Sequence, residues 1–169
     1  MKRSRDSLPF RISLVVLLST LLIEGVLFLL LYHTLLGERV VEEIDRLESR
    51  AESHANVLAM NFSEETIGHV ATMESETDTK VAITNSAHDL LQASRSFPQV
   101  LVDTVDTKQR IGPFDDTTIL EDDWENEPYL SVRTPIVDDT GTQYGYVYMF
   151  LPTEIIHGIS HRLQLRFLY

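Results

Sequence analysis

One apolar stretch constrains the fold of this chain more than any other feature. Residues 12–36 read ISLVVLLSTLLIEGVLFLLLYHTLL, with a single carboxylate at Glu24 and a single histidine at His33. A helix of this length would measure about 37 Å, which is enough to cross a hydrocarbon core of about 30 Å with some tilt. The sequence therefore predicts a transmembrane helix at residues 12–36.

The charges on either side of this stretch predict its orientation. Basic residues dominate the preceding segment and acidic residues the following one: Lys2, Arg3, Arg5 and Arg11 before it, and Glu38, Glu42, Glu43 and Asp45 after it. Because basic flanks stay in the cytoplasm, we expect residues 1–11 to form a cytoplasmic basic tail. Residues 37–169 would then lie outside the cell membrane, as one extracytoplasmic domain of a single-pass protein.

A cleaved signal peptide is the rival interpretation of the same stretch. Such a peptide has an apolar region of about 7–15 residues and small residues at its cleavage site. Here the apolar stretch is longer, and the residues that end it, Tyr-His-Thr-Leu-Leu-Gly at 32–37, lack that pattern. We therefore expect an uncleaved anchor. Glu24 is costly in a bilayer, and two interpretations stay open: a tolerated protonated acid, or a hydrogen bond to a second membrane helix or a dimer mate.

Composition excludes several classes of function. Lys and Arg total 14 against 26 Asp and Glu, which gives a formal net charge of −12. A general nucleic-acid binder needs a basic face to release counterions, so no nucleic-acid partner is expected.

Cysteine is absent. A disulfide framework, a thiolate zinc site, an iron–sulfur cluster and a cysteine nucleophile are therefore excluded.

The pattern beyond the anchor predicts an α+β domain with a central antiparallel sheet. Apolar spacings of three and four over residues 38–59 indicate a long juxtamembrane helix that continues the anchor. Its apolar stripe would pack against the domain or form the seam of a homodimer.

A second helix is expected at 63–72, capped by Ser63. Strands are expected at 80–84 and 90–94, and a hairpin at 129–137 and 143–151 leads into a final helix from Thr153. Residues 95–127 are irregular and acidic, with a short strand or helix at 100–102.

The segment PYLSVRTPIVDDTGTQYGYVYMFLPTEII, at 128–156, carries a family resemblance. Together with the anchor and the juxtamembrane helix, it resembles the extracytoplasmic single-Cache or PAS-like sensor domain of bacterial sensor histidine kinases. Such domains also occur in chemoreceptors and cyclic-dinucleotide enzymes. The resemblance implies that the hairpin leads through a short helix into a second membrane span. Residues 163–169 would approach that span, which this chain does not contain.

Catalytic motifs are not expected in this chain. His161 superficially resembles the phosphoacceptor histidine of a kinase, but Arg162 stands where an acidic neighbour is expected, and the predicted topology keeps it away from ATP. His157 and His161 have a spacing that can bind zinc, but Gly158 replaces the glutamate of the metalloprotease motif. We expect no enzymatic activity in this chain and no cofactor.

Two ligand sites are hypothesised. On the hairpin, strand alternation would place an arginine among tyrosines, a combination that suits a carboxylate or another small anion. The residues are Tyr129, Ser131, Arg133, Tyr144, Tyr146 and Tyr148. The alternative is the outer face of a half-buried sheet, with Arg133 balancing a nearby acid. A weaker hypothesis is a site for a divalent cation in the acidic segment, at Asp115, Asp116, Asp122 and Asp123, whose alternative is a solvated loop.

The sequence predicts a membrane-anchored outer domain, and its resemblance to these sensors implies the ligand-sensing input module of a membrane-bound two-component sensor histidine kinase. Its expected partners are the membrane, a second copy through the juxtamembrane helices, and a small anion or a divalent cation. The competing hypothesis is a stand-alone single-pass protein whose outer domain binds or regulates another membrane protein.

Overall fold

A computed structural model of the protein describes residues 8–108 and 114–167. The chain divides into two compact units, Met1–Arg39 and Val40–Tyr169. Helix α1, Leu8–Met60, begins in the first unit and ends in the second. From Leu8 to Leu31 its apolar side chains are exposed, as at Leu22 and Leu30. By length and composition, α1 is the helix in the described residues that can cross a membrane, so the predicted anchor at 12–36 lies within a suitable helix.

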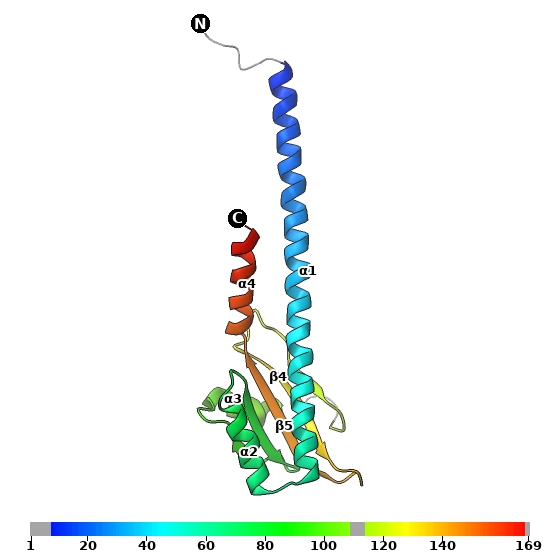
Figure 1. Ribbon diagram of the computed structural model, residues 1–169, viewed down its shortest axis with the longest axis vertical. Coiled ribbons are helices and arrows are strands. Elements are labelled where there is room, and N and C mark those ends of the chain that lie inside the picture. The colour runs from blue at the N-terminus through cyan, green and yellow to red at the C-terminus, as the bar shows by residue number, and fades with distance from the viewer. Residues whose placement is uncertain (1–7, 109–113, 168–169) are drawn as a thin grey trace. The chain divides into compact units, whose positions relative to one another are not determined.

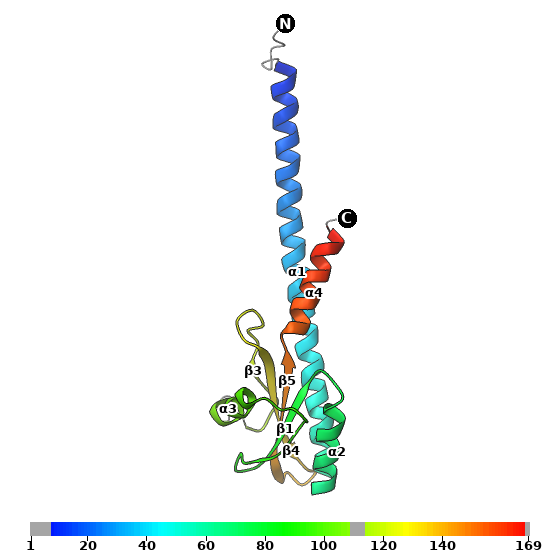
Figure 2. The same cartoon turned by 90° about the vertical axis from the view of Figure 1, so that its left-hand side faces the viewer.

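The second unit is built around a five-stranded sheet whose neighbouring strands are all antiparallel. The order across the sheet is β2-β1-β5-β4-β3. Figures 1 and 2 show the sheet, with β1, β3, β4 and β5 labelled. The strands are β1 Lys80–Asn85, β2 Leu90–Ala93, β3 Thr118–Glu121, β4 Tyr129–Val137 and β5 Gln143–Pro152. The remaining helices are α2 Glu64–Glu74, α3 Gln99–Lys108 and α4 Glu154–Phe167. The predicted α+β class is confirmed.

Two local signals define the helix starts as expected. The Ser63 hydroxyl accepts a hydrogen bond from the Thr66 backbone N–H at 3.3 Å, which caps α2. Pro152 ends β5 two residues before α4 begins at Glu154. A third constraint concerns Gly145, which pairs with Asn85 across β1 and β5. A Cβ atom there would lie 1.9 Å from the Thr84 carbonyl oxygen, so the close approach of these two strands requires glycine.

The sheet has two differently covered faces (Figure 2). The second-unit part of α1 packs with α2 on one face, which we call the α1 face, where Leu47, Leu58 and Met149 belong to one buried cluster. Helix α3 covers the other face, the α3 face, where Leu101 and Phe150 belong to a second cluster. Strand alternation on β5 divides its side chains between the two: Val147, Met149 and Leu151 against Tyr146, Tyr148 and Phe150.

The structure corrects the prediction for residues 95–127. This segment contains a full helix, α3, which is longer than the short strand or helix expected at 100–102, and a strand, β3, which was not expected. In α3 the buried residues are Leu101 and Val105, four apart, which is a short helical stripe. In β3 only Leu120 is buried, so the strand offers little alternation to detect. The many acidic residues in this segment made the weak apolar periodicity of α3 and β3 hard to recognise in the sequence.

Candidate functional site

The α3 face has a buried arginine at its centre. Arg133 lies in the middle of β4, opposite Tyr148 on β5, and its side chain is 0% exposed. Its guanidinium carbon lies 4.9 Å from the centre of the Phe114 ring and 5.5 Å from that of Tyr146. Contacts of this kind attract a cation to the negative face of each ring. The cationic group is thus held between aromatic rings inside the domain.

His88, in the β1–β2 turn, adds a further ring to the aromatic side chains around Arg133. Its backbone has φ = 68°, an uncommon conformation for a residue other than glycine. The His88 ring stacks on Tyr146 at 4.6 Å with an interplanar angle of 5°, and its Nδ1 lies 3.4 Å from the Tyr148 hydroxyl. Burial and the charge of Arg133 lower the pKa of His88, while burial raises the pKa of Tyr148. Both rings are therefore neutral around neutral pH, and Arg133 carries the local charge.

Five of the six residues predicted for the anion site share the α3 face. Arg133 and Ser131 pair with Tyr148 and Phe150 across β4 and β5, Tyr146 and Tyr148 belong to the α3-face cluster, and Tyr129 packs against it. The alternative, in which Arg133 balances an acid on the outer face of a half-buried sheet, is wrong about that face because Arg133 is fully buried. Sequence reasoning missed His88 and Phe114, which lie in loops distant in sequence from the hairpin.

Tyr144 is the sixth residue, and its predicted place is wrong. Its ring stacks on Phe62 at 5.3 Å, and its hydroxyl donates a hydrogen bond to Asp138 at 2.8 Å. It packs against the α1-face cluster. The β4–β5 register shifts between Ile136 and Val137, so simple alternation fails just before Tyr144.

A small cavity of about 110 Å³ lies on the α3 face, beside the Arg133 cluster. Its polar lining includes Thr104 and Lys108 of α3, Glu121 of β3, and Tyr129 and Ser131 of β4, and Phe150 supplies an apolar wall. Lys108 forms an ion pair with Glu121, which lowers the pKa of that carboxyl despite partial burial, and also donates to the Leu120 carbonyl at 3.2 Å.

Ser131 is the distinctive residue of this cavity. Its hydroxyl is buried and makes no hydrogen bond within the part of the chain that the structure describes. A buried hydroxyl without a partner costs free energy, so a molecule in the cavity that bonds to Ser131 would recover it. The volume suits a few water molecules or a ligand of a few heavy atoms. Serine, lysine and tyrosine together offer donors to an anionic or neutral polar group.

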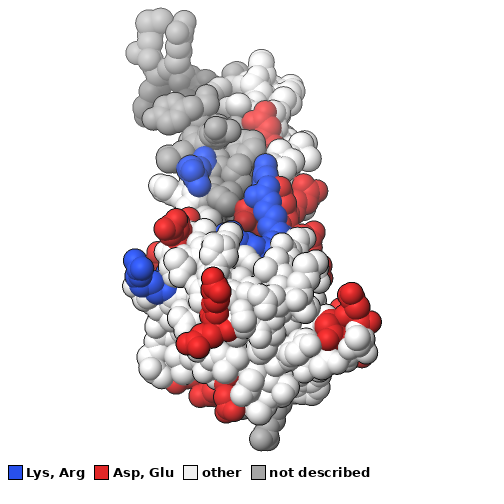
Figure 3. Space-filling view, turned by 60° about the horizontal axis from the view of Figure 1, so that its bottom comes forward, with Lys and Arg blue, Asp and Glu red and all other residues white. Residues whose placement is uncertain are grey.

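The acidic residues predicted for a cation site lie on both sides of β3. Asp115 and Asp116 precede the strand, and Asp122 and Asp123 follow it. Asp123 accepts hydrogen bonds from the Asn126 side chain, at 2.9 Å for its Oδ2. Among the described residues no group of three or more His, Asp or Glu side chains is arranged to hold a metal ion. The cation hypothesis therefore gains no support. On the surface shown in Figure 3, acidic side chains are scattered over several places.

Comparisons with known proteins add no family to this description. No protein-family model and no curated protein matches the sequence.

Proposed function

We propose that this chain is the extracytoplasmic input module of a membrane-bound sensor histidine kinase, and that it senses a small ligand on the α3 face. The observation that carries the proposal is the composition of α1. This one helix includes a segment suited to spanning a membrane and also Ile44, Leu47 and Leu58, which belong to the core of the sheet domain. A shift in domain packing would therefore act on the same helix that enters the membrane.

The flanking charges support the direction of signalling. The basic residues before the anchor favour a cytoplasmic N-terminus, and the acidic residues after it favour an outer domain. The ligand would then bind outside, and its preference for one packing arrangement would bias the membrane helix. The resemblance of residues 128–156 to single-Cache and PAS-like sensors supports the same assignment.

The chemistry of the α3 face supports a small anionic ligand. The buried Arg133 supplies positive charge on this face, and Ser131 supplies a buried hydroxyl to the cavity, where Lys108 is paired with Glu121 and Glu127 is a further lining residue. Charge-assisted hydrogen bonds to a carboxylate would be strong in such partly dry surroundings. The cavity is small, so binding of anything larger than a few heavy atoms would require α3 to move away from the sheet.

A chimeric receptor tests the proposal. Residues 1–169 are joined through a membrane helix to a histidine-kinase transmitter, and autophosphorylation in membrane vesicles is measured against a panel of small mono- and dicarboxylates. We expect at least one carboxylate to change kinase output. Ser131→Val, which removes the hydroxyl and narrows the cavity, should abolish that response, whereas Ser86→Val in the exposed β1–β2 turn should preserve it.

Two results would refute the proposal. One is a correctly inserted chimera whose output no carboxylate changes. The other is a Ser131→Val chimera that is folded and responds as fully as the parent. The first result would favour a protein that binds a membrane partner instead of a ligand.

A further inference from the structure

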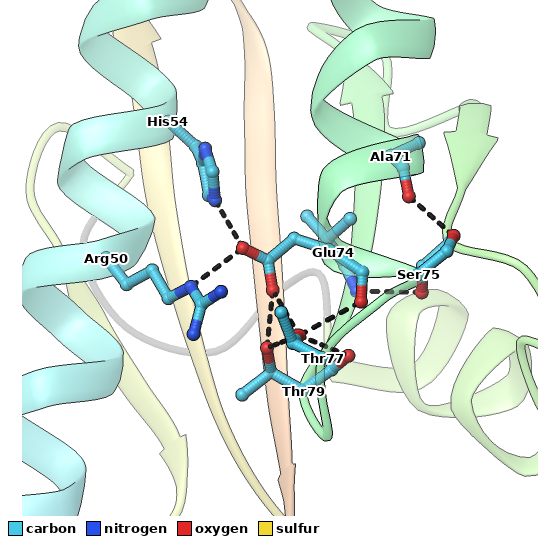
Figure 4. A network of polar contacts seen from close by, with 9 residues as sticks. Arg50, His54, Ala71, Glu74, Ser75, Thr77 and Thr79 are labelled. Carbon is cyan, nitrogen blue, oxygen red and sulfur yellow. Dashed lines mark hydrogen bonds and ion pairs between the residues drawn. The ribbon is translucent and has the colours of Figure 1, made fainter.

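A second polar cluster lies on the α1 face, around a buried carboxylate. Glu74, the last residue of α2, is 1% exposed. One of its oxygens lies 2.7 Å from Arg50 Nε and 2.7 Å from His54 Nε2, both on α1. The other oxygen accepts hydrogen bonds from Thr77, at 3.0 Å, and from Thr79 (Figure 4). Burial opposes ionisation, but hydrogen bonds from His54 and Thr79 and the charge of Arg50 lower the pKa of Glu74 to about 2.

This cluster fixes the orientation of Arg50. The guanidinium uses its Nε for Glu74, as Figure 4 shows, which leaves its two terminal nitrogens outside the Glu74 contact. The Arg50 side chain is 42% exposed and forms part of the wall of a cavity of about 400 Å³. Because Glu74 is buried and held by several groups, it restrains the arginine before any ligand arrives. A planar guanidinium restrained in this way is prepared to bind a carboxylate with two parallel hydrogen bonds.

The cavity wall carries both signs of charge and an apolar surface. Besides Arg50, the charged residues are Arg46, Glu43 and Asp78, and the apolar residues are Leu47, Leu151 and Ile155. Arg46 already pairs with Glu42 at 2.6 Å and with Glu43 at 3.3 Å. Arg50 is therefore the cation best placed to accept a ligand, and the exposed Asp78, in the turn between α2 and β1, is the anion best placed.

We propose that this cavity binds a small zwitterion with an aliphatic body, of the kind represented by a free aliphatic amino acid. Its carboxylate would bind the terminal nitrogens of Arg50, its ammonium group would lie against Asp78, and its hydrocarbon part would contact Leu47, Leu151 and Ile155. The charges on the wall balance, so a molecule without net charge fits best. A simple anion would add uncompensated charge near Glu43 and Glu74, and a simple cation would lie close to Arg50.

The position of this site gives it a consequence beyond binding. Its wall joins α1 to the junction of β5 and α4, because Arg50 lies on α1, Leu151 on β5 and Ile155 on α4. An occupant would tie these three elements together. The site lies on the opposite face of the sheet from the proposed α3-face ligand, and it depends neither on that ligand nor on the chain being part of a kinase.

Calorimetric titration of the full chain in lipid nanodiscs tests the proposal with L-leucine as the probe. Two analogues each lack one charge: 4-methylpentanoate lacks the ammonium group, and 3-methylbutylamine lacks the carboxylate. We expect leucine to bind at millimolar concentration or below, and each analogue to bind at least about tenfold more weakly, since each loses one charge-assisted interaction.

Substitutions in the protein test which residues bind the two charged groups of leucine. Arg50→Lys keeps a positive charge beside Glu74 but removes the planar fork, and it should weaken leucine binding at least about tenfold. Asp78→Asn should weaken leucine binding while leaving 4-methylpentanoate unaffected. Asp139→Asn, an exposed aspartate that lines a different cavity near the end of α1, is the matched control and should change neither.

The outcomes decide the proposal even if Arg50→Lys fails to fold, because Asp78→Asn changes an exposed residue outside the core. Absence of leucine binding at millimolar concentration would overturn the proposal. Equal binding of leucine and 4-methylpentanoate, or equal effects of Asp78→Asn and Asp139→Asn, would also overturn it.

Discussion

The two faces of the central sheet are built on different principles. On the α1 face, aliphatic side chains from α1, α2 and three strands form an extended cluster, and the charged Glu74 in its midst is held by Arg50, His54 and two threonines. On the α3 face the cluster is smaller and largely aromatic. It encloses the charged Arg133 and lies beside a cavity with a buried hydroxyl.

This difference assigns a role to each face. On the α1 face a cavity adjoins Arg50, but the extended aliphatic cluster and the fully bonded Glu74 carboxylate beside it make an arrangement that resists change, which suits the face that includes α1. A small cluster, a cavity and an unsatisfied hydroxyl make an arrangement that a ligand can alter, which suits α3 as the sensing element. The α1 face thus provides the stable base, and the α3 face provides the adjustable part.

Removing a large side chain from each face gives the largest expected difference. Leu58 on α1 is 0% exposed, and Leu58→Ala should lower the free energy of unfolding by about 3–5 kcal/mol because a closely packed site cannot collapse. Leu101→Ala on α3 should cost less, about 2–3 kcal/mol, because Leu101 already lines the cavity there.

Urea unfolding followed by fluorescence of the single tryptophan, Trp124, measures both variants. Equal costs for the two substitutions would remove the energetic distinction between the faces.

The charged cluster of the α1 face should make the free energy of unfolding depend on pH. The pKa of Glu74 falls from an ordinary value near 4.5 to about 2 in the folded protein. Its stabilising contribution is therefore fully present above pH of about 4.5 and is lost as the pH falls toward 2. Glu74→Gln should cost about 3 kcal/mol at neutral pH and progressively less in acid.

Glu121 and Asp138 also have lowered pKa values, so wild-type stability falls in acid for more than one reason. The informative quantity is therefore the difference in stability between wild type and Glu74→Gln, measured by thermal unfolding at several pH values from 6 to 2. If the plots of stability against pH for the two proteins stay parallel over that range, the charge of Glu74 contributes nothing to stability.

The smallest effect is expected on the α3 face. Ser131→Ala removes a buried hydroxyl that lacks a hydrogen bond within the described residues, so stability should change by no more than about 0.5 kcal/mol and can rise. Ser94→Ala is the matched control, because the Ser94 hydroxyl accepts a hydrogen bond from the buried Val81 N–H at 3.1 Å. Losing that partner should cost about 1–3 kcal/mol. If thermal unfolding gives the two variants equal losses, Ser131 is not the unsatisfied group described above.

Strong local signals made much of the fold predictable. The long apolar stretch, the cap at Ser63 and the alternating hairpin each depend on residues close in sequence, and each appears as expected. Helix α3 was predicted only as a short strand or helix at 100–102 because its apolar stripe is short, although Pro98 just before it is a start signal of the kind recognised at Pro152. Strand β3 has one buried residue and offered no comparable signal.

The candidate site was predicted in part for the same reason. Alternation along one hairpin brought Ser131, Arg133 and Tyr148 to a common face, but a register shift moved Tyr144 to the other. His88 and Phe114 reach Arg133 and Tyr146 through tertiary packing of distant loops, which no local pattern encodes. The Glu74 cluster was not predicted either, because its contacts between α1 and α2 span 20 or more residues of sequence.

Hydrogen exchange of the full chain in lipid nanodiscs tests the distinction between the two faces most directly. Amide protons of α3 should exchange through a local opening whose free energy lies well below that of global unfolding. Amide protons of α1 between Ile44 and Leu58 should exchange only near the global value, since this segment forms the stable base. Equal protection of α3 and this part of α1 would contradict the account, because the sheet would then have no adjustable face on which to sense a ligand.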